Sequence, residues 1–330
     1  MLLILLLGIS LIISQDFYLN LIGFDKNNLF NTKLFNYRKN SNFEEIHNMN
    51  KSFKFMSKEN GDLFFVILIA SYNNIKYYEK NIKSVLDQNY QNYIAIYMDD
   101  ISTDGTAEAV EEYLSINDLS NHFILIKNNE KKYCLKNYVD SINSFCLDSA
   151  IIITLDGDDL LFQNDALEVL NNIYKDGKTW ITTGDPLCFS SRLKHSAYHD
   201  LYCNGLGLKN SWKNPYDKDL FEIGIRKSRI WCFFHLRTFY TSLFLKINNK
   251  DFLDSNGEYF KHTEDLAFML PMLEMSGLEH YKFISDPILY FYNDTNVIRS
   301  GNVWNTLRLT STFNFIFSKK SYSKLDKLEV

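Results

Sequence analysis

The sequence predicts an α/β fold with a mostly parallel, Rossmann-like sheet, helices on both faces of the sheet, and a less regular second half. Two observations support this prediction. Continuous apolar runs such as FFVILIA at 64–70 alternate with segments of helical spacing, and several of these runs end in carboxylate or amide side chains. Strands that are apolar throughout are typical of parallel sheets, because helices cover both of their faces.

The expected elements follow one another through the first half of the chain. Apolar runs that indicate buried strands lie at 64–70, 93–98, 122–126 and 150–155. Segments whose apolar residues recur at helical spacing lie at 75–88, about 105–115 and about 134–147. Right-handed crossovers are expected to join the strands, and such sheets bind ligands beyond the carboxyl ends of their strands. Polar residues that directly follow a strand are therefore the candidates for a site.

The chain is expected to divide into four parts. It opens with MLLILLLGISLIIS, which has the length of a signal-peptide core and is short for a membrane span of about 20 residues. Through this run we expect entry to the secretory pathway or attachment to a membrane, with a cytoplasmic location as the alternative. The parts are a signal peptide or short anchor at 1–15, a polar Asn-rich stem at 16–61, a folded domain at 62–300 with halves 62–160 and 161–300, and a C-terminal tail packed on that domain at 301–330.

Composition and motifs exclude several classes of protein. The 35 basic and 40 acidic residues give a formal net charge of -5, and no stripe of Lys and Arg interleaves with aromatic residues, so we expect no nucleic acid partner. The five cysteines form no C-x-x-C pair that would suggest structural zinc. The first strand is not followed by G-x-G-x-x-G, and no G-x-x-x-x-G-K-[ST] occurs, so a dinucleotide fold and a P-loop are unsupported.

Three carboxylates stand at the end of the strand expected at 150–155. The stretch IIITLDGDDLLF places Asp156, Asp158 and Asp159 within four positions. At roughly 4 Å and an effective dielectric near 20, two like charges repel by about 4 kcal/mol, so we expect a cation beside them. Oxygen ligands at a strand end suit Mn²⁺ or Mg²⁺, which also hold diphosphates. An equivalent strand end carries DDISTDGT at 99–106, which on its own is typical of ordinary turns and helix caps.

Three stretches together resemble the family 2 glycosyltransferases: FFVILIASYNN, SVLDQNYQNYIAIYMDDISTDGT and TLDGDD. The resemblance covers roughly residues 62–300 and implies a GT-A fold. It also implies an inverting enzyme that moves a sugar from a nucleotide diphosphate sugar, expected to be a UDP-sugar, to a hydroxyl of a glycan, protein or lipid acceptor. One position departs from the family, because Ile101 stands where the family usually has Gly after the acidic pair.

The resemblance implies roles for residues of the first half. The side chains that would meet the nucleotide sugar are Ser71, Asn73, Asp99, Asp100, Lys136 and Asp156. Lys131 and Lys132 are alternatives to Lys136, and an ordinary surface lysine is the competing interpretation. Asp156 and Asp158 correspond to the D-x-D metal motif, with Asp159 shaping the site, so the three are the candidates to hold the cation.

The second half holds the acceptor-side and catalytic candidates. WCFFHLRTF at 231–239 contains Trp231, His235 and Arg237, and it resembles a segment that borders the acceptor in a subgroup of the family. KHTEDLAFMLPMLEMSG at 261–277 places Glu264 and Asp265 before an apolar helical run, where acidic residues commonly stabilise a helix start. By resemblance, Asp265 is the catalytic base and Glu264 supports it.

Two other functions compete with this one. LDGDDL partly matches the D-x-D-x-[TV] nucleophile motif of haloacid dehalogenase-type phosphatases, but Leu160 stands where Thr or Val is expected, and that motif normally follows the first strand. A module that binds nucleotide sugar or glycan without turnover would have lost its metal or base carboxylates, and both sets are present here. A catalytic glycosyltransferase is therefore the preferred hypothesis.

Overall fold

The computed structural model describes residues 62–189, 224–228, 234–296 and 306–330. The parts expected at 1–15 and 16–61, and the acceptor-side candidate Trp231, lie outside the described residues. Within the described ranges, the helices are all too short or too polar to cross a membrane.

A seven-stranded sheet forms the centre of the described structure, in the order β3-β2-β1-β4-β8-β6-β9. Its strands are β1 (Phe65–Ser71), β2 (Tyr93–Asp99), β3 (Phe123–Lys127), β4 (Ile151–Asp156), β6 (Ile181–Gly184), β8 (Arg237–Tyr240) and β9 (Tyr281–Ile284). Among these strands, β8 alone runs against its neighbours, β4 and β6, and the others share one direction. The predicted α/β class and the mostly parallel sheet are confirmed.

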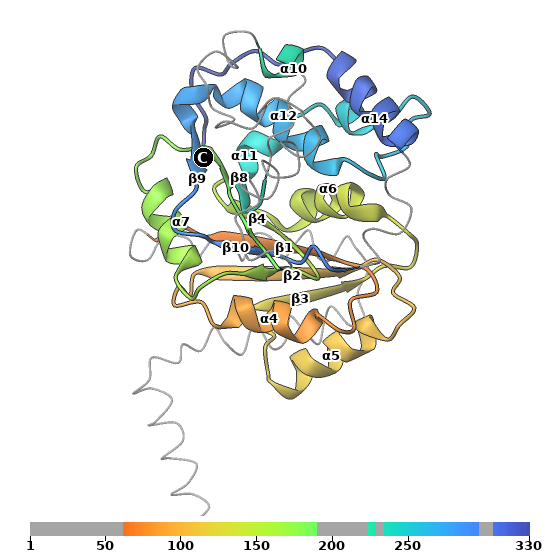
Figure 1. Ribbon diagram of the computed structural model, residues 1–330. Helices are drawn as coiled ribbons and strands as arrows, with labels where there is room; N and C mark the ends of the chain where they lie inside the picture. Colours follow the sequence, from red (N-terminus) through yellow and green to blue (C-terminus); the bar gives the residue numbers. More distant parts are fainter. Residues whose placement is uncertain (1–61, 190–223, 229–233, 297–305) are drawn as a thin grey trace, which may run out of the picture.

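Helices cover both faces of this sheet (Figure 1). On one face lie α4 (Tyr78–Leu86) and α5 (Thr106–Ile116), and on the other α6 (Tyr133–Phe145), α11 (Thr241–Phe244) and α12 (Glu264–Ser276). The remaining helical elements are α7 (Ala166–Tyr174), α10 (Ile225–Ser228), α14 (Thr306–Ser318) and the 3-10 turns η1 (Asn249–Phe252) and η2 (Leu278–His280). Helices α4 and α6 bury the apolar stripes that their sequence spacing predicts, including Ile82, Val85, Leu135, Val139 and Ile142.

The first half of the fold follows directly from local sequence. Every strand and helix expected between residues 64 and 155 is present, and its boundaries differ from the expected ones by at most three residues. Strand β1 explains why the pattern is so clear, because Phe65 through Ile69 are at most 1% exposed. Burying a side chain of this size contributes about 1.5–3 kcal/mol, so a strand covered on both faces selects apolar residues throughout.

Among the described residues, the second half adds β6, β8 and β9 to the same large sheet. The stretch WITTGDP contains β6, and HLRTF contains the start of β8, which inserts between β4 and β6. A smaller three-stranded sheet has the order β5-β10-β7. Its strands are β5 (Leu160–Leu161), β7 (Leu187–Cys188) and β10 (Tyr290–Tyr292). Because β5 directly follows the DGDD stretch, this small sheet lies beside the end of β4.

Helix α12 is buried on nearly all sides, which explains its continuous apolar sequence. Its Glu274 carboxylate accepts two hydrogen bonds of 2.9 Å from the guanidinium of Arg226 on α10. Arg226 also donates to the carbonyl oxygen of Ile316 on α14, at 2.6 Å. The Leu325 N–H donates to the carbonyl oxygen of Met275, at 2.9 Å. These contacts join α10, α12 and the described end of the chain.

Candidate active site

The carboxyl ends of three parallel strands meet at one edge of the central sheet. β1 pairs with β2 so that Ser71 lies opposite Asp99, and β4, on the other side of β1, ends at Asp156. β8 runs in the opposite direction, so its first residue, Arg237, lies at this same edge. The reversal therefore also brings the residues just before β8, including His235, to the carboxyl end of β4.

Two glycines allow backbone segments to meet closely at this edge. A Cβ atom on Gly157 would lie 2.8 Å from the Cβ atom of Ser71 and 2.7 Å from the side-chain nitrogen of Asn74. A Cβ atom on Gly184, at the end of β6, would lie 2.9 Å from the carbonyl oxygen of His235. Distances this short exclude a side chain at either position unless the strand ends move apart.

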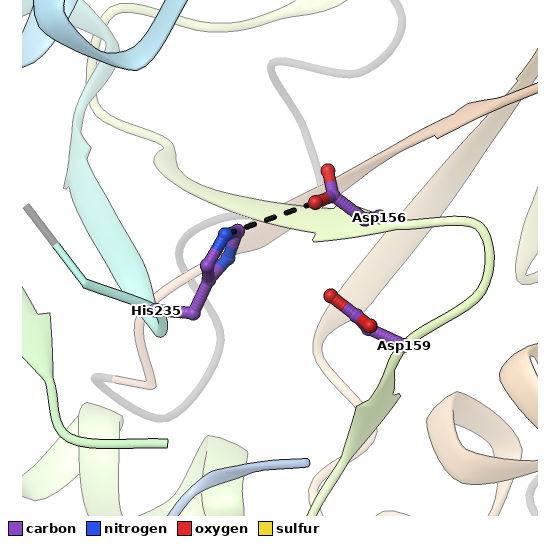
Figure 2. Close-up of side chains that lie close together, drawn as sticks. All are labelled: Asp156, Asp159 and His235. Carbon is purple, nitrogen blue, oxygen red and sulfur yellow. Dashed lines mark ion pairs between the residues drawn. The ribbon is translucent and has the colours of Figure 1, made fainter. Parts of the chain in front are cut away.

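Asp156, Asp159 and His235 turn toward one another at this edge, as Figure 2 shows. One ligand atom from each residue lies within 4.8 Å of the others, and His235 Nε2 is 3.7 Å from Asp156 Oδ2. Asp159 and His235 are buried, whereas Asp156 is partly exposed. Two carboxylates and an imidazole can hold a divalent cation, whose charge would offset the repulsion between the carboxylates. These three residues are called the metal group below.

Hydrogen bonds hold the metal group in position. The Tyr290 hydroxyl donates to Asp159 Oδ2 at 2.7 Å, and the Asn293 N–H donates to Asp159 Oδ1 at 2.8 Å. The side-chain amide of Asn81 donates to the carbonyl oxygens of Asp156, at 2.9 Å, and Asp159, at 2.7 Å. The Tyr290 ring also stacks on the imidazole of the metal group, with 4.4 Å between ring centroids. Residues around metal ligands commonly orient them in this way.

Asp158 lies outside the metal group, and His235 lies inside it. The Asp158 carboxylate is buried and accepts a hydrogen bond from the side-chain amide of Asn296, at 2.8 Å, and it lies outside the metal group. His235, expected on the acceptor side, lies within that group. Metal binding by Asp158 remains a prediction.

The residues expected at the nucleotide pocket also tie neighbouring loops together. Ser71 is buried, and its hydroxyl oxygen accepts hydrogen bonds from the Tyr97 hydroxyl, at 2.9 Å, and from the Asn74 amide, at 3.0 Å. Asn73 Oδ1 accepts a hydrogen bond from the Thr103 N–H at 2.8 Å. These contacts hold the loop after β1 against the loop after β2.

Asp99 and Asp100 are buried and organise the loops that follow β2 and β3. Asp99 accepts hydrogen bonds from the N–H and the hydroxyl of Ser102. Asp100 accepts hydrogen bonds from the backbone N–H groups of Lys132, at 2.8 Å, and Tyr133, at 2.9 Å. Burial alone would raise the pKa of Asp100, but these hydrogen bonds and nearby positive charge outweigh burial and lower that pKa below its usual value. Asp100 is therefore ionised at neutral pH and fixes the start of α6.

The candidate lysines lie in different surroundings. Lys131 lies beside the end of β1, with its Nζ atom 3.0 Å from the ring centroid of the exposed Tyr72. Lys132 and Lys136 both form ion pairs with Asp140 on α6. Of the three, Lys131 is thus the one whose charge lies at the strand ends.

The two carboxylates at the start of α12 differ in their partners. Arg237 Nη2 lies 2.9 Å from Asp265 Oδ2, and both side chains are buried. Burial alone would lower the pKa of Arg237, but the negative charges of Asp265, Asp156 and Glu264 outweigh it and raise that pKa. Burial, and secondly the charge of Asp265, raises the pKa of Glu264 to about 7.

Sequence reasoning did not identify the residues that support the metal group. The sequence pattern weakly indicates a special role for Asn81, because it is a polar residue on the otherwise apolar, sheet-facing side of α4. No such pattern indicates Tyr290, since it stands in an apolar run that is typical of an ordinary core strand. Both lie far from Asp159 in sequence, at separations of 78 and 131 residues.

Comparison with known families gives one match. A family model described as Glycosyl transferase family 2 matches residues 66–238, a range that contains the whole metal group and more than half of the chain. No curated protein matches this chain.

Comparison with solved structures gives distant likenesses. S. aureus TarS is 16% identical over 70% of this chain, with a TM-score of 0.49, and this chain spans 37% of the TarS chain. TarS 1-349 in complex with UDP is 16% identical, with a TM-score of 0.48. The match covers 70% of this chain and 60% of the TarS 1-349 chain. The mannosyltransferase PcManGT from Pyrobaculum calidifontis, in complex with GDP-Man and Mn²⁺, is 15% identical, with a TM-score of 0.41. The match covers 76% of this chain and 65% of the PcManGT chain.

Proposed function

We propose that this chain, which belongs to glycosyl transferase family 2, transfers a sugar from a UDP-sugar to a hydroxyl of a glycan or glycoconjugate, with inversion of the anomeric configuration. Membership of the family makes the protein a nucleotide-sugar-dependent glycosyltransferase. The observation that carries the proposal is the metal group at the carboxyl ends of parallel strands, where sheets of this type bind their ligands.

The metal group fits a divalent cation, and we propose Mn²⁺. Asp156 and Asp159 offer oxygen atoms and His235 offers a nitrogen atom, all within 4.8 Å of one another. An imidazole among the ligands favours a transition-metal ion over Mg²⁺, which prefers oxygen ligands. When bound, such a cation would supply positive charge to the departing diphosphate. The protein's own contribution is to hold the three ligands in place, mainly through the hydrogen bonds to Asp159.

The strand ends of β1 and β2 are the proposed place for the nucleotide. Ser71 and Asn73 stand at the end of β1, and Asp99 stands at the end of β2 directly opposite Ser71. Their hydrogen bonds to neighbouring loops support the proposal, because a binding loop that is already fixed loses less conformational entropy when the donor binds. Lys131 supports it further by bringing a positive charge to the same place.

The carboxylates at the start of α12 are the proposed source of the catalytic base. An acceptor hydroxyl is a weak nucleophile, so a carboxylate within hydrogen-bond reach must take its proton as it attacks the anomeric carbon. Attack opposite the departing diphosphate inverts the anomeric configuration. Glu264 and Asp265 lie together, and Arg237 links Asp265 to the edge that carries the metal group. The resemblance to family 2 assigns the role of base to Asp265.

A panel of nucleotide sugars tests this function. The full chain is incubated with UDP- and GDP-sugars in Mn²⁺, in Mg²⁺ or with EDTA, with and without mixed glycan acceptors, and products are identified by mass spectrometry. We expect one UDP-sugar to be consumed, faster in Mn²⁺ than in Mg²⁺, with no turnover in EDTA. Tight donor binding without turnover would indicate a binding module. Phosphate release from phosphomonoesters would indicate a phosphatase.

The metal group has a test that does not depend on activity. We expect Asp159→Asn and His235→Ala each to weaken Mn²⁺ binding, measured by electron paramagnetic resonance, at least tenfold. Asp140→Asn, which removes a carboxylate of α6 outside the metal group, is the matched control. Equal Mn²⁺ affinity in all four proteins would contradict the assignment.

We also propose that the apolar run at 1–15 directs the protein to the secretory pathway or attaches it to a membrane. Carbonate extraction of the expressed full chain is the test. Recovery entirely in the soluble cytosolic fraction would contradict this proposal.

A further inference from the structure

We propose that Tyr133 binds the acceptor, and that its ring stacks on a sugar ring of that acceptor. The proposal rests on the proposed function, because it assigns a binding residue to the acceptor of that same transfer. Tyr133 is the first residue of α6, and its side chain is partly exposed.

The backbone of Tyr133 has a strained conformation. Its φ of 60° lies in the left-handed region, which is unfavourable for a residue with a bulky side chain. Glycine and asparagine adopt this conformation more easily. Strained residues persist where the surrounding structure fixes them, and they cluster at functional sites. A tyrosine at this position is therefore not explained by local backbone preference.

A buried polar network fixes the strained conformation. Asp100 Oδ2 accepts a hydrogen bond from the Tyr133 N–H at 2.9 Å, and the side-chain amide of Asn137 donates to the Tyr133 carbonyl oxygen at 3.0 Å. The side-chain amide of Asn128 links the network, because it donates to Asp100 Oδ1 at 2.9 Å and to Asn137 Oδ1 at 2.7 Å. Asp100 is 4% exposed and Asn137 3%. The backbone that carries the ring is thus held before any ligand binds, which lowers the entropy cost of binding.

The ring of Tyr133 does not serve the apolar core. It is absent from the side chains that form the core of the described structure. Its contacts are with polar side chains, because the His262 ring lies edge-on with 6.4 Å between ring centroids. The Nζ atoms of Lys131 and Lys261 lie 5.8 Å and 5.7 Å from the centroid of the Tyr133 ring. Cations at this distance are attracted to the ring, and the exposed part of the ring is left to a ligand.

The neighbours of the ring place it between the proposed nucleotide site and the carboxylates of α12. Lys131 Nζ also lies 3.0 Å from the ring centroid of Tyr72, beside the end of β1, where we propose that the nucleotide binds. Lys261 and His262 shortly precede α12, which begins with the carboxylates proposed to supply the base. An acceptor hydroxyl must reach both the anomeric carbon of the donor and that base. A sugar stacked on Tyr133 would lie between the two.

A sugar ring matches the chemistry of this surface. One face of a pyranose presents C–H groups that pack on an aromatic ring, while its hydroxyl groups need polar partners around that ring. The ammonium groups of Lys131 and Lys261 and the imidazole of His262 supply such partners. Nucleobases also stack on aromatic rings, so the test must separate the acceptor from the donor.

The test compares the full-length wild type with Tyr133→Asn and Tyr133→Phe, using chitotetraose, cellotetraose and mannotetraose as acceptors. Asparagine tolerates the left-handed backbone but lacks the ring, so Tyr133→Asn should melt at or above the temperature of the wild type. It should nevertheless raise the KM for the acceptor about tenfold, with the KM for the donor and the Mn²⁺ affinity unchanged. Tyr133→Phe keeps the ring and should stay within about threefold of the wild-type KM.

Asp118→Asn is the matched control. Asp118 also has a left-handed φ, of 50°, but it precedes β3, whereas Tyr133 follows that strand. The control should change neither KM.

Four results would overturn the inference. An unchanged acceptor KM in Tyr133→Asn would show that the ring does not meet the acceptor. A raised donor KM in that variant would place the nucleotide on the ring. A large fall in its melting temperature would show that the ring serves the fold. An acceptor KM as high in Tyr133→Phe as in Tyr133→Asn would assign the contact to the hydroxyl and not to the ring.

The inference and the proposed function fail in different ways. If the wild type turns over no nucleotide sugar, the proposed function is wrong. Saturation-transfer NMR of the same three tetrasaccharides then still tests the inference, because it requires no turnover. A signal that Tyr133→Asn loses would support the inference, and no signal with the wild type would overturn it. If the wild type consumes a nucleotide sugar but glycosylates none of the tetrasaccharides, only the inference is overturned.

Discussion

At the scale of single residues, Gly157 lies where the turn after β4 passes the end of β1. Gly157→Ala should lower the free energy of unfolding by about 1–3 kcal/mol, because the added Cβ overlaps Ser71 and Asn74 in a packed region. It should also weaken Mn²⁺ binding, since Asp156 and Asp159 flank the turn. Urea denaturation and Mn²⁺ titration measure the two effects.

A double variant separates the overlap from other effects of Gly157→Ala. Ser71→Gly removes the Cβ and Oγ atoms that the new methyl group meets. The loss of unfolding free energy in the double variant should therefore be smaller than the sum of the losses in the two single variants. Strict additivity would show that the overlap is not the cause.

Ile101 is a second residue whose backbone conflicts with its side chain. Its φ of 61° lies in the left-handed region, which a β-branched residue occupies only with strain. The side chain is 37% exposed, so little packing opposes a change. Ile101→Gly should raise the free energy of unfolding by about 0.5–1 kcal/mol, the relief of strain less the added entropy of the unfolded chain. Ile101→Val keeps the β-branch and should give no gain in the same urea titration.

At the scale of elements, β10 links the small sheet to the metal group through the Tyr290 hydroxyl. Tyr290→Phe keeps the ring that stacks on His235 but removes the donor to Asp159. We expect stability to fall by about 1–3 kcal/mol and Mn²⁺ affinity to fall about tenfold. Tyr113→Phe on α5 removes a hydroxyl far from this site and is the control. Equal Mn²⁺ affinity in both variants would contradict the supporting role of β10.

Elements set by local sequence were predictable, and elements set by distant pairing were not. Strands β1, β2 and β4 are apolar because both of their faces are covered, so their sequences reveal them without further information. The sequence of β8 shows neither that it runs antiparallel nor that it inserts between β4 and β6, because both depend on partners more than 50 residues away.

The candidate site shows the same division. The carboxylates of DGDD were identifiable because an acidic cluster at an apolar strand end is electrostatically costly. His235 could not be placed beside Asp156 from sequence, because its position depends on the reversal of β8. The separate surroundings of Glu264 and Asp265 likewise depend on Arg237, a residue of that same strand.

At the scale of the whole molecule, Glu264 should influence how stability varies with pH. Its folded pKa of about 7 exceeds the usual 4.5, so between these values the folded protein binds more protons than the unfolded chain. The free energy of unfolding therefore falls as pH rises through this window. The glutamine of Glu264→Gln cannot ionise. The free energy of unfolding of this variant should therefore exceed that of the wild type by about 2–3 kcal/mol at pH 8 and by little near pH 5.

Glu279 gives the control of opposite sign. A hydrogen bond from Lys324 lowers the pKa of Glu279, so its ionised form stabilises the fold and Glu279→Gln should lower stability at pH 8. Urea denaturation at pH 5, 6, 7 and 8 measures both variants. Parallel curves for the wild type and Glu264→Gln would show that Glu264 has an ordinary pKa in the folded protein.

The position of β8 also constrains the order in which the chain folds. Until residues 237–240 pair with it, the apolar strand β4 has an open edge, and such an edge favours pairing with other chains and aggregation. A fragment that stops near residue 160 would expose this edge. Docking of β8 closes this edge and, in the same event, brings His235 and Arg237 to the candidate active site. Protection from aggregation and completion of the candidate active site are thus expected in a single folding step.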